Sequence, residues 1–335
     1  MPVSTESPAP AHTALTATVA KEYVHRAALA DVFLTGWSAK GPDAFLIEAQ
    51  WPRYHGFYAS EPGLYDPLLL CETVRQTLPL LTHTAYGVPF GHHLSWSRFQ
   101  YALNPRAMRI ERTPAELQIH VTCTDIKYRR GLPVGLTMHY EVMRGDLLLA
   151  VASTAFNCHT PALYQRLRVG RGNVSQMFWN VPEPAPPLSK ELCRRDRMQD
   201  VVLSPTGEAD RWQLRVDTSH PVLFDHPVDH VPGMLLLEAA RQAAFACTPA
   251  TAAYADPSAG AAGSSATPAQ GPCWPVSMDV GFRRYVEFDS PCWITAEATR
   301  PQTAGHDRGL RVTAVQGDDP TPAFTATVAL ARRLP

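Results

Sequence analysis

This 335-residue sequence lacks several features that would assign it to a common class of protein. It has no Cys-x-x-Cys pair, and its seven cysteines are odd in number and widely scattered, which argues against a disulfide framework and against a zinc site. No apolar run approaches the roughly 20 residues of a membrane span, so no membrane association is expected. A net charge of −1, without a basic face or a helix-turn-helix pattern, argues against nucleic-acid binding.

The first 20 residues also lack the features of a signal peptide. They are rich in Pro, Ser, Thr and Ala, with neither a basic start nor an apolar core. We therefore expect a disordered tail over residues 1–20, a cytoplasmic location, and free thiols in a reducing compartment.

What the sequence does contain is one unusual helix pattern, present twice. From Met234 to Ala246 every side chain is apolar except Glu238, Arg241 and Gln242, which is typical of a helix enclosed by other structure. The segment after Pro67 has the same pattern, and its polar residues stand 166 positions earlier in each case (238 − 72, 241 − 75 and 242 − 76): Glu72, Arg75 and Gln76. The spacing places these side chains on one helix face, where burial requires charged partners or a polar pocket. Such self-similarity predicts two copies of one structural unit.

Each predicted helix follows a pair of strands and precedes a run of further strands. Asp66 and Pro67 are a good N-cap and first helical residue, so the first helix should begin there. One buried helix wrapped by an antiparallel sheet, twice over, predicts an α+β fold of tandem hotdog units. The expected boundaries are a first unit over 21–158, a linker over 159–200, and a second unit over 201–335 with a mobile low-complexity loop over 248–272.

The motif from His226 to Gln242 closely resembles the second hotdog repeat of the A-factor synthase (AfsA-type) family of γ-butyrolactone biosynthesis proteins. The first half matches through residues 51–53, 65–70 and 72–76, in the same order. The resemblance implies a double hotdog acyltransferase that moves a β-ketoacyl group from acyl carrier protein to the hydroxyl of dihydroxyacetone phosphate. In the family the ester cyclises to a butenolide phosphate, a precursor of γ-butyrolactone, butenolide or furan signals that control antibiotic production.

The resemblance also implies that no metal or other cofactor takes part, because the acyl group arrives on the phosphopantetheine of the carrier protein. Transfer to an alcohol then needs a base, donors for an oxyanion and a grip on the phosphate. We expect the base to be Glu72 or Glu238, with a pKa raised by partial burial. Arg75 and Arg241 should orient that carboxylate or hold the phosphate. Because pockets should form between the two units, Glu72 with Arg241 is preferred over Glu238 with Arg75.

Further site residues are expected around the two helix starts. Backbone amides near Leu68 and Met234 are the expected oxyanion donors. His226, Asp229 and His230 have the composition of a metal cluster, but two prolines make this stretch a loop and no fourth ligand is apparent. Asp229 and His230 are therefore expected to cap the helix or line the pocket mouth. The other expected substrate-binding residues are Asp66, Gln76, Gly233, Met234 and Gln242, with Arg98, Arg283 and Arg284 as secondary phosphate candidates, although an exposed arginine without a special role is the commoner case.

The sequence leaves more than one function open. Residues 232–238 also look like the helix start of hotdog β-hydroxyacyl-carrier-protein dehydratases, whose catalytic acid lies at the position of Glu238, but the dehydratase histidine falls at Phe224. A thioesterase and a non-catalytic acyl-binding module also stay open, although such a module could replace buried charges with leucine. Cys71 could serve as a nucleophile, but the second repeat has Leu237 there, so a core thiol is expected. Two fused units leave monomer and homodimer both open.

Overall fold

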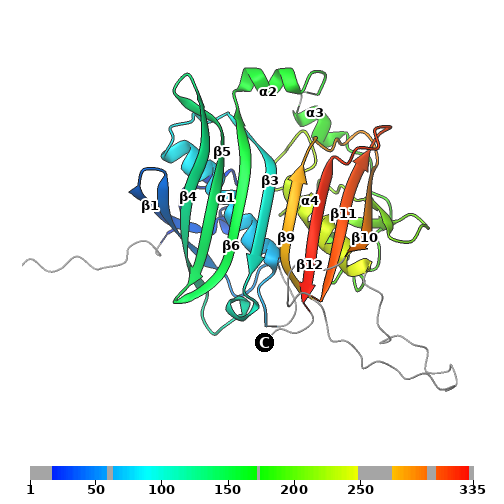
Figure 1. Cartoon of the computed structure of the whole chain (residues 1–335). Helices are drawn as coiled ribbons and strands as arrows, with labels where there is room; N and C mark the ends of the chain where they lie inside the picture. Colours follow the sequence, from blue (N-terminus) through cyan, green and yellow to red (C-terminus); the bar gives the residue numbers. More distant parts are fainter. Residues whose placement is uncertain (1–16, 59–62, 172–173, 248–273, 300–306, 332–335) are drawn as a thin grey trace, which may run out of the picture.

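The computed structural model describes residues 17–58, 63–171, 174–247, 274–299 and 307–331. Its main body is one 12-stranded antiparallel sheet. The two long helices, α1 (Pro67–Thr84) and α4 (Gly233–Ala246), contact each other and cover the same face of the sheet, behind it in Figure 1. The predicted fold of two hotdog units, each a sheet wrapped around one buried helix, is confirmed.

The strand order across the sheet is palindromic about its centre. The strands are β1 Leu34–Gly41, β2 Ala44–Trp51, β3 His93–Leu103, β4 Ala115–Arg129, β5 Leu132–Arg144, β6 Leu147–His159, β7 Leu203–Pro205, β8 Arg211–Leu214, β9 Trp274–Phe282, β10 Cys292–Thr299, β11 Arg308–Gln316 and β12 Phe324–Ala331. From the two edges inward, the orders are β1-β2-β4-β5-β6-β3 and β7-β8-β10-β11-β12-β9. The halves join where β3 pairs with β9, which places Phe99 opposite Val280.

The two long helices begin and are buried as the sequence predicts. Asp66 is the N-cap of α1, and its carboxylate accepts a hydrogen bond from Leu68 N at 2.9 Å. Helix α4 begins at Gly233, one residue before its predicted start. Both helices are apolar on almost every side because the sheet, the other helix and the loops enclose them. The carboxylates of Glu72 and Glu238 are therefore fully buried.

The segment expected as a linker between the two units is partly helical. It contains two short helices, α2 (Pro161–Leu167) and α3 (Val174–Trp179), at the top of the view in Figure 1. Thr160 caps α2 by accepting from Leu163 N, and Pro161 takes the first helical position. The 3-10 helices of the described chain are Lys21–Val24, Leu29–Asp31, Pro105–Met108 and Met198–Asp200.

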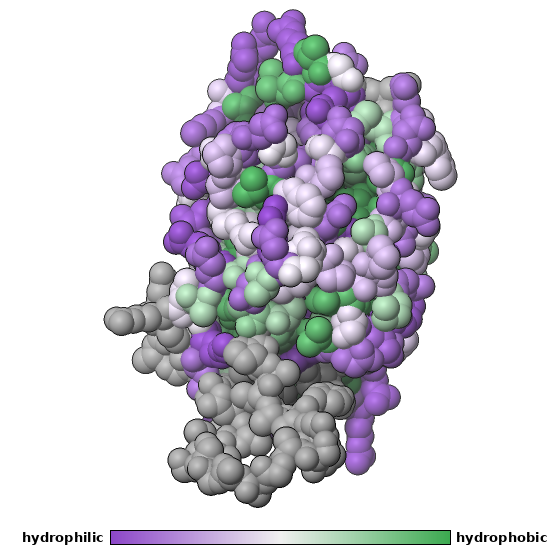
Figure 2. All heavy atoms as spheres, turned by 90° about the vertical axis from the view of Figure 1, so that its right-hand side faces the viewer, coloured by the Kyte–Doolittle hydropathy of each residue, from purple (hydrophilic) through white to green (hydrophobic). Residues whose placement is uncertain are grey.

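Parts of the predicted organisation fall outside the described residues. These are residues 1–16 of the expected tail and the expected mobile loop over 248–272. Val19, within the expected tail, donates its N–H to Leu34 O at 2.9 Å. None of the helices in the described ranges has both the length and the apolar character of a bilayer crossing. On the side shown in Figure 2, hydrophobic residues occur in small groups among hydrophilic ones.

Candidate active site

Each half contains a fully buried glutamate that is paired with an arginine of its own helix. In α1, Arg75 donates to the two carboxylate oxygens of Glu72 at 2.8 and 2.7 Å. In α4, Arg241 donates to both oxygens of Glu238 at 2.8 Å. The combination of Glu72 with Arg241 preferred from the sequence is therefore not an ion pair in the described structure, because each glutamate pairs within its own repeat.

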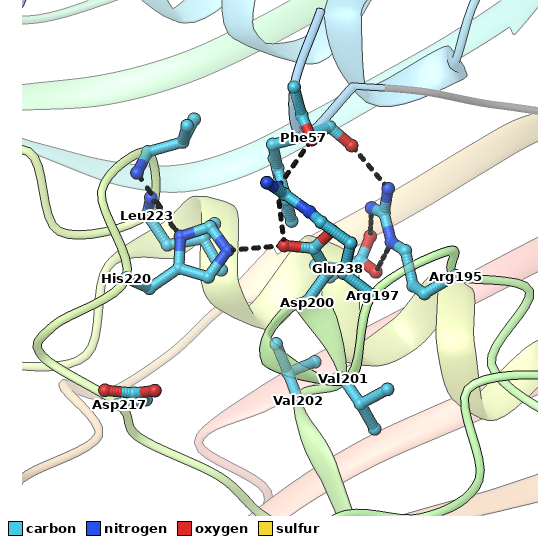
Figure 3. A network of polar contacts seen from close by, with 12 residues as sticks. Phe57, Arg195, Arg197, Asp200, Val201, Val202, Asp217, His220, Leu223 and Glu238 are labelled. Carbon is cyan, nitrogen blue, oxygen red and sulfur yellow. Dashed lines mark hydrogen bonds and ion pairs between the residues drawn. The ribbon is translucent and has the colours of Figure 1, made fainter.

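A second arginine, not anticipated from the sequence, completes each cluster from outside the helix. Arg26 donates to Glu72 at 2.9 Å, and Arg195, in the linker, donates to Glu238 at 2.7 Å (Figure 3). A repeated signal marks these arginines, since each stands five residues (31 − 26 and 200 − 195) before an Asp-Val-x-Leu segment: Asp31-Val32-Phe33-Leu34 and Asp200-Val201-Val202-Leu203.

Both of these arginines also reach across to the other half of the molecule. Arg26 Nη1 donates to the carbonyl of Val222 at 3.0 Å, and Arg195 Nη1 donates to the carbonyl of Phe57 at 2.6 Å. Each arginine thus bonds a glutamate of its own half and a loop of the other. The clusters fix the two halves relative to each other.

The two loops that receive these bonds are held by matching histidine–aspartate pairs. Nε2 of His55 lies 3.2 Å from Asp31 Oδ1, and Nε2 of His220 lies 3.2 Å from Asp200 Oδ1 (Figure 3). Nδ1 of each ring accepts backbone N–H groups of its own loop, for example Leu223 N on His220 at 3.1 Å. Nε2 therefore carries the ring proton and donates it to the aspartate.

Gln76 and Gln242, expected to bind substrate, instead hydrogen-bond to the buried glutamates and to nearby backbone groups. Both side chains are fully buried, and each amide donates to the glutamate one turn earlier in its helix. Each also closes a pair of backbone hydrogen bonds, which engage Asp31 O and Phe33 N for Gln76, and Asp200 O and Val202 N for Gln242. These bonds leave neither amide facing a pocket.

The ionisation of the two glutamates is the reverse of the prediction. Burial alone would raise the pKa of Glu238, but the charges and hydrogen bonds of Arg195 and Arg241 lower the pKa to about 2. The pKa of Glu72 is lowered in the same way by its two arginines, against the effect of burial. A fully buried carboxylate that binds a proton so weakly is a poor base near neutral pH. The expected raised pKa is wrong, and the geometry favours a structural role for both glutamates.

A pocket of about 920 Å³ opens at the start of α4, between the two halves. Its walls come from both halves and from the linker helix α2. Of the catalytic and substrate-binding residues expected from the sequence, it is lined by Arg75, His230, Gly233, Met234, Arg283 and Arg284. Its larger apolar lining residues include Leu78, Pro79, Leu94, Trp96, Leu236 and Phe282.

The starts of the two helices differ, and only the start of α4 lines this pocket. The start of α1 is closed by Asp66, which is fully buried and caps its own helix instead of facing a substrate. The equivalent residue of α4 (66 + 166) is Pro232, and no described side chain caps the amides there. A Cβ atom on Gly233 would lie 2.8 Å from the Trp96 ring, so glycine permits this close approach. The amides of Gly233 and Met234 therefore have no hydrogen-bond acceptor among the described residues and can act as donors.

Asp229 lies buried behind His230 at this pocket. Its carboxylate accepts hydrogen bonds from the Tyr164 hydroxyl at 2.8 Å and from Arg168 Nε at 3.1 Å, and His230 Nδ1 lies 2.7 Å away. Burial raises the pKa of Asp229, but these donors together hold it well below its ordinary value, so the carboxylate is ionised. Tyr164 and Arg168 belong to the predicted linker over 159–200, for which the sequence predicts no part in the site.

The arginines expected to bind phosphate divide into two groups. Arg98 lies outside the pocket and pairs with the exposed Asp279 at 2.9 Å. Arg284 lies at the pocket rim, where an aspartate also holds it at 3.3 Å. Its neighbour Arg283 lines the same rim, and its exposed guanidinium has no hydrogen bond or ion pair to a described residue. Arg283 is therefore the rim arginine with the most free donors.

Two further hypotheses raised by the sequence have no support in the described geometry. His226 pairs with Asp225, whereas His230 pairs with Asp229, so the residues that resembled a metal cluster do not converge. Cys71 is fully buried, its thiol donates to a helix carbonyl, and burial raises its pKa well above the ordinary value. The prediction of a core thiol at Cys71 is confirmed.

The A-factor biosynthesis hotdog domain (AfsA) matches the sequence twice, over residues 8–160 and 180–331. The chain belongs to the A-factor biosynthesis hotdog family. A relative from Streptomyces virginiae, named 2-oxo-3-(phosphooxy)propyl 3-oxoalkanoate synthase, is 42% identical over 94% of this chain and 98% of the relative. Relatives of the same name from Streptomyces griseus and Streptomyces coelicolor are 41% and 39% identical, over 82% and 88% of this chain and 84% and 86% of theirs.

Two solved structures show a weak likeness to this A-factor biosynthesis family member. A putative oleoyl thioesterase from Lactobacillus plantarum superposes with a TM-score of 0.48 at 13% identity, covering 88% of this chain and 98% of that structure. The 12:0-ACP thioesterase from Umbellularia californica gives a TM-score of 0.49 at 10% identity, covering 88% and 100%. Neither likeness bears on the activity of this chain.

Proposed function

We propose that this chain transfers a 3-oxoacyl group from a carrier thioester to the hydroxyl of dihydroxyacetone phosphate. The observation that supports this most directly is the pocket at the start of α4, where free helix amides, an apolar wall and arginines meet. The name of the relatives describes the corresponding product, a 2-oxo-3-(phosphooxy)propyl ester of a 3-oxoalkanoate, and the match covers 98% of one of them.

The free amides at the start of α4 suit the charge that develops during transfer. When the hydroxyl oxygen attacks the thioester, the carbonyl oxygen becomes an oxyanion. The N–H groups of Gly233 and Met234 are positioned as donors to it, and the positive end of the helix dipole adds to their effect.

The arginines of the pocket suit the phosphate group of the acceptor. Arg283 at the rim has free donors, and Arg75 reaches the pocket from α1 with 22% of its side chain exposed. A guanidinium binds phosphate through two parallel hydrogen bonds. Glu72 then acts as a positioning residue, because its two bonds fix the Arg75 side chain.

The apolar wall of the pocket suits an acyl chain. We propose acyl carrier protein as the donor, with the chain delivered on its phosphopantetheine arm, so that the transfer needs no resident cofactor. Because both substrates are made inside cells, we propose a cytoplasmic reaction. Cyclisation of the ester would supply the butenolide phosphate precursor of γ-butyrolactone, butenolide or furan signals.

Mass spectrometry of the reaction products tests this proposal. The full chain is mixed with a 3-oxoacyl carrier protein and dihydroxyacetone phosphate, and we expect the phosphorylated ester or its butenolide together with the free carrier thiol. Arg283→Met should raise the KM for dihydroxyacetone phosphate about tenfold, since a hydrogen bond to a charged group contributes about 1.5–3 kcal/mol. Arg98→Met, which changes an arginine outside the pocket, is the matched control and should leave that KM unchanged.

Three other outcomes would each contradict the transferase assignment. Free 3-oxo acid without ester would indicate a thioesterase, and loss of water from a 3-hydroxyacyl carrier protein would indicate a dehydratase. A thioester that binds and stays unchanged would indicate a non-catalytic acyl-binding module.

A further inference from the structure

We infer that His230 is the general base of this reaction and that Asp229 holds it in place, an inference that rests on the proposed transfer to dihydroxyacetone phosphate. A base is the one requirement of the chemistry that the buried glutamates do not meet, since neither Glu72 nor Glu238 lines the pocket. His230 does line it, immediately before α4 begins.

The protonation of the His230 ring follows from its partner. Nδ1 lies 2.7 Å from Asp229 Oδ1, and an ionised carboxylate can only accept a hydrogen bond. Nδ1 therefore carries the proton of the neutral ring, and Nε2 has the free lone pair. Nε2 makes no hydrogen bond to any residue in the described ranges, so it is available to take a proton from a substrate.

Asp229 is itself held too firmly to turn away from the ring. The Tyr164 hydroxyl lies 2.8 and 3.0 Å from the two carboxylate oxygens and donates its one proton to the pair. Arg168 donates to Oδ2 at 3.1 Å and to the backbone carbonyl of Asp229 at 2.9 Å. The Asp229 side chain is only 6% exposed, so water does not replace these bonds. This arrangement makes Asp229 a positioning residue for His230.

The ring of His230 is packed but not enclosed. It meets the Tyr285 ring edge-on at 4.5 Å between centroids, and 28% of its side chain is exposed at the pocket. Glu287 pairs with Arg168, and His93 stacks on Tyr164 at 3.6 Å. The titratable and charged groups around the ring are thus Asp229, Tyr164, Arg168, Tyr285, Glu287 and His93.

The position of His230 along the chain brings the base close to the oxyanion donors. Gly233 follows three residues later, and both residues line the same pocket. Between them, Val231 N donates to Val286 O at 2.9 Å, which anchors the short segment to the loop after β9. The proton acceptor and the free amides of α4 are therefore fixed on one piece of backbone.

Three other histidines line the pocket and are weaker candidates. Nε2 of His159 lies 2.8 Å from the Ser95 hydroxyl, and burial lowers the pKa of this ring. Nε2 of His25 is occupied by His83 Nε2 at 2.8 Å, and burial and nearby positive charges lower the pKa of His25 to about 3. A base that weak takes up little of the hydroxyl proton. His226 has an aspartate beside it as His230 does, but its side chain is 45% exposed and it stands farther from the start of α4.

The proposed steps balance without any further reactant. His230 Nε2 takes the hydroxyl proton of dihydroxyacetone phosphate as the hydroxyl oxygen bonds to the thioester carbon, and the oxyanion forms at the amides of α4. The oxyanion then collapses, the carbon–sulfur bond breaks, and the imidazolium returns the proton to the departing thiolate. The products are the ester and the free thiol of the carrier, and His230 is neutral again.

Steady-state kinetics of two matched variants of the full chain test the assignment. His230→Gln removes the proton acceptor, and His226→Gln makes the same change in the other Asp-His pair of the loop. We expect kcat of His230→Gln to fall by about 10²–10⁴-fold with KM for dihydroxyacetone phosphate within about twofold, and kcat of His226→Gln to fall far less. His120→Gln, which changes an exposed histidine of β4 outside this pocket, is the control and should leave both constants unchanged. In His230→Gly, added imidazole should restore part of the lost rate, which a merely structural role would not allow.

A third measurement does not depend on the folding of a His230 variant. Diethyl pyrocarbonate is added to the His226→Gln chain, and the loss of activity should follow the carbethoxylation of His230 in peptide maps. Inactivation that precedes modification of His230, or a His230→Gln chain with wild-type kcat, would overturn the inference while ester formation by the wild type still supported the proposed function. A rate loss in His226→Gln alone would indicate that His226 is the base, and this result would also overturn the inference about His230. If the wild type forms no ester, the proposed function fails and the assignment of His230 fails with it.

Discussion

Arg195 donates a hydrogen bond to the carbonyl of Phe57 at 2.6 Å, across the boundary between the two halves of the molecule. The same guanidinium is only 2% exposed and pairs with Glu238 through a second nitrogen at 2.6 Å. Arg26 repeats the arrangement from the other half by bonding Val222. The buried charges that first suggested a catalytic pair therefore form a joint between the two hotdog units.

Loss of Arg195 should destabilise the fold strongly. In Arg195→Met, Glu238 keeps Arg241 but loses a buried cation, and the free energy of unfolding should fall by about 3–5 kcal/mol. Urea unfolding followed by circular dichroism measures this. Arg98→Met removes an exposed pair with Asp279 and should change the unfolding free energy by at most about 1 kcal/mol. Equal losses of unfolding free energy in the two variants would show that the buried contacts of Arg195 stabilise the fold no more than an exposed ion pair does.

The low pKa of Glu238 predicts a loss of stability in acid. Its folded pKa of about 2 lies below the ordinary value of 4.5, so the unfolded state binds the proton first. The stabilisation is fully present above about pH 4.5 and is lost as the pH falls towards about 2. Unfolding free energies measured between pH 6 and 3 should decline for the wild type and decline less steeply for Glu238→Gln. Parallel curves for the two proteins would contradict the assigned pKa.

A side chain at Gly233 should disturb the pocket. The Cβ of Gly233→Ala would meet the Trp96 ring at 2.8 Å, and that ring stacks with both Phe99 and Phe282, which restrict its movement. We expect the unfolding free energy to fall by about 1–3 kcal/mol and the transfer rate to fall with it. Gly56→Ala is the matched control, because no atom lies within 4 Å of its added Cβ. A Gly233→Ala protein as active and stable as this control would show that the helix start does not need glycine.

The hydroxyl of Tyr164 should matter for rate without binding substrate itself. Tyr164→Phe removes the hydroxyl that donates its one proton to the Asp229 carboxylate and leaves Arg168 in place, so the carboxylate should hold His230 less firmly. We expect kcat to fall about tenfold while KM for dihydroxyacetone phosphate stays nearly constant. Tyr128→Phe, on an exposed tyrosine, should change neither constant. A rise of KM alone in Tyr164→Phe would instead place this hydroxyl in contact with the substrate.

The elements that sequence analysis placed correctly depend on local signals. Asp66 and Pro67 mark the start of α1 within two residues, and the apolar period around Glu72 and Glu238 marks both buried helices. The partners of Arg26 and Tyr164 could not be predicted from local signals, because the side chains that they bond lie 46 and 65 residues away along the chain. Helix α2 was missed for a related reason, since its Thr160 cap lies in a polar, proline-containing stretch that favours an irregular prediction.

By itself, the sequence determined that the chain is a duplication with two buried Glu-x-x-Arg-Gln helix faces, because helix period and repeat spacing are properties of the chain order. Only the tertiary structure decided what those faces do. The pKa of Glu238 depends on Arg195, which comes from the linker, so the lowered value could not be read from the helix alone. The tertiary structure also decided which helix start is open to the pocket. The buried Asp66 caps the start of α1, whereas Pro232 leaves the start of α4 without a side-chain cap. Burial and charge are set by residues distant in the chain, and folding alone brings them together.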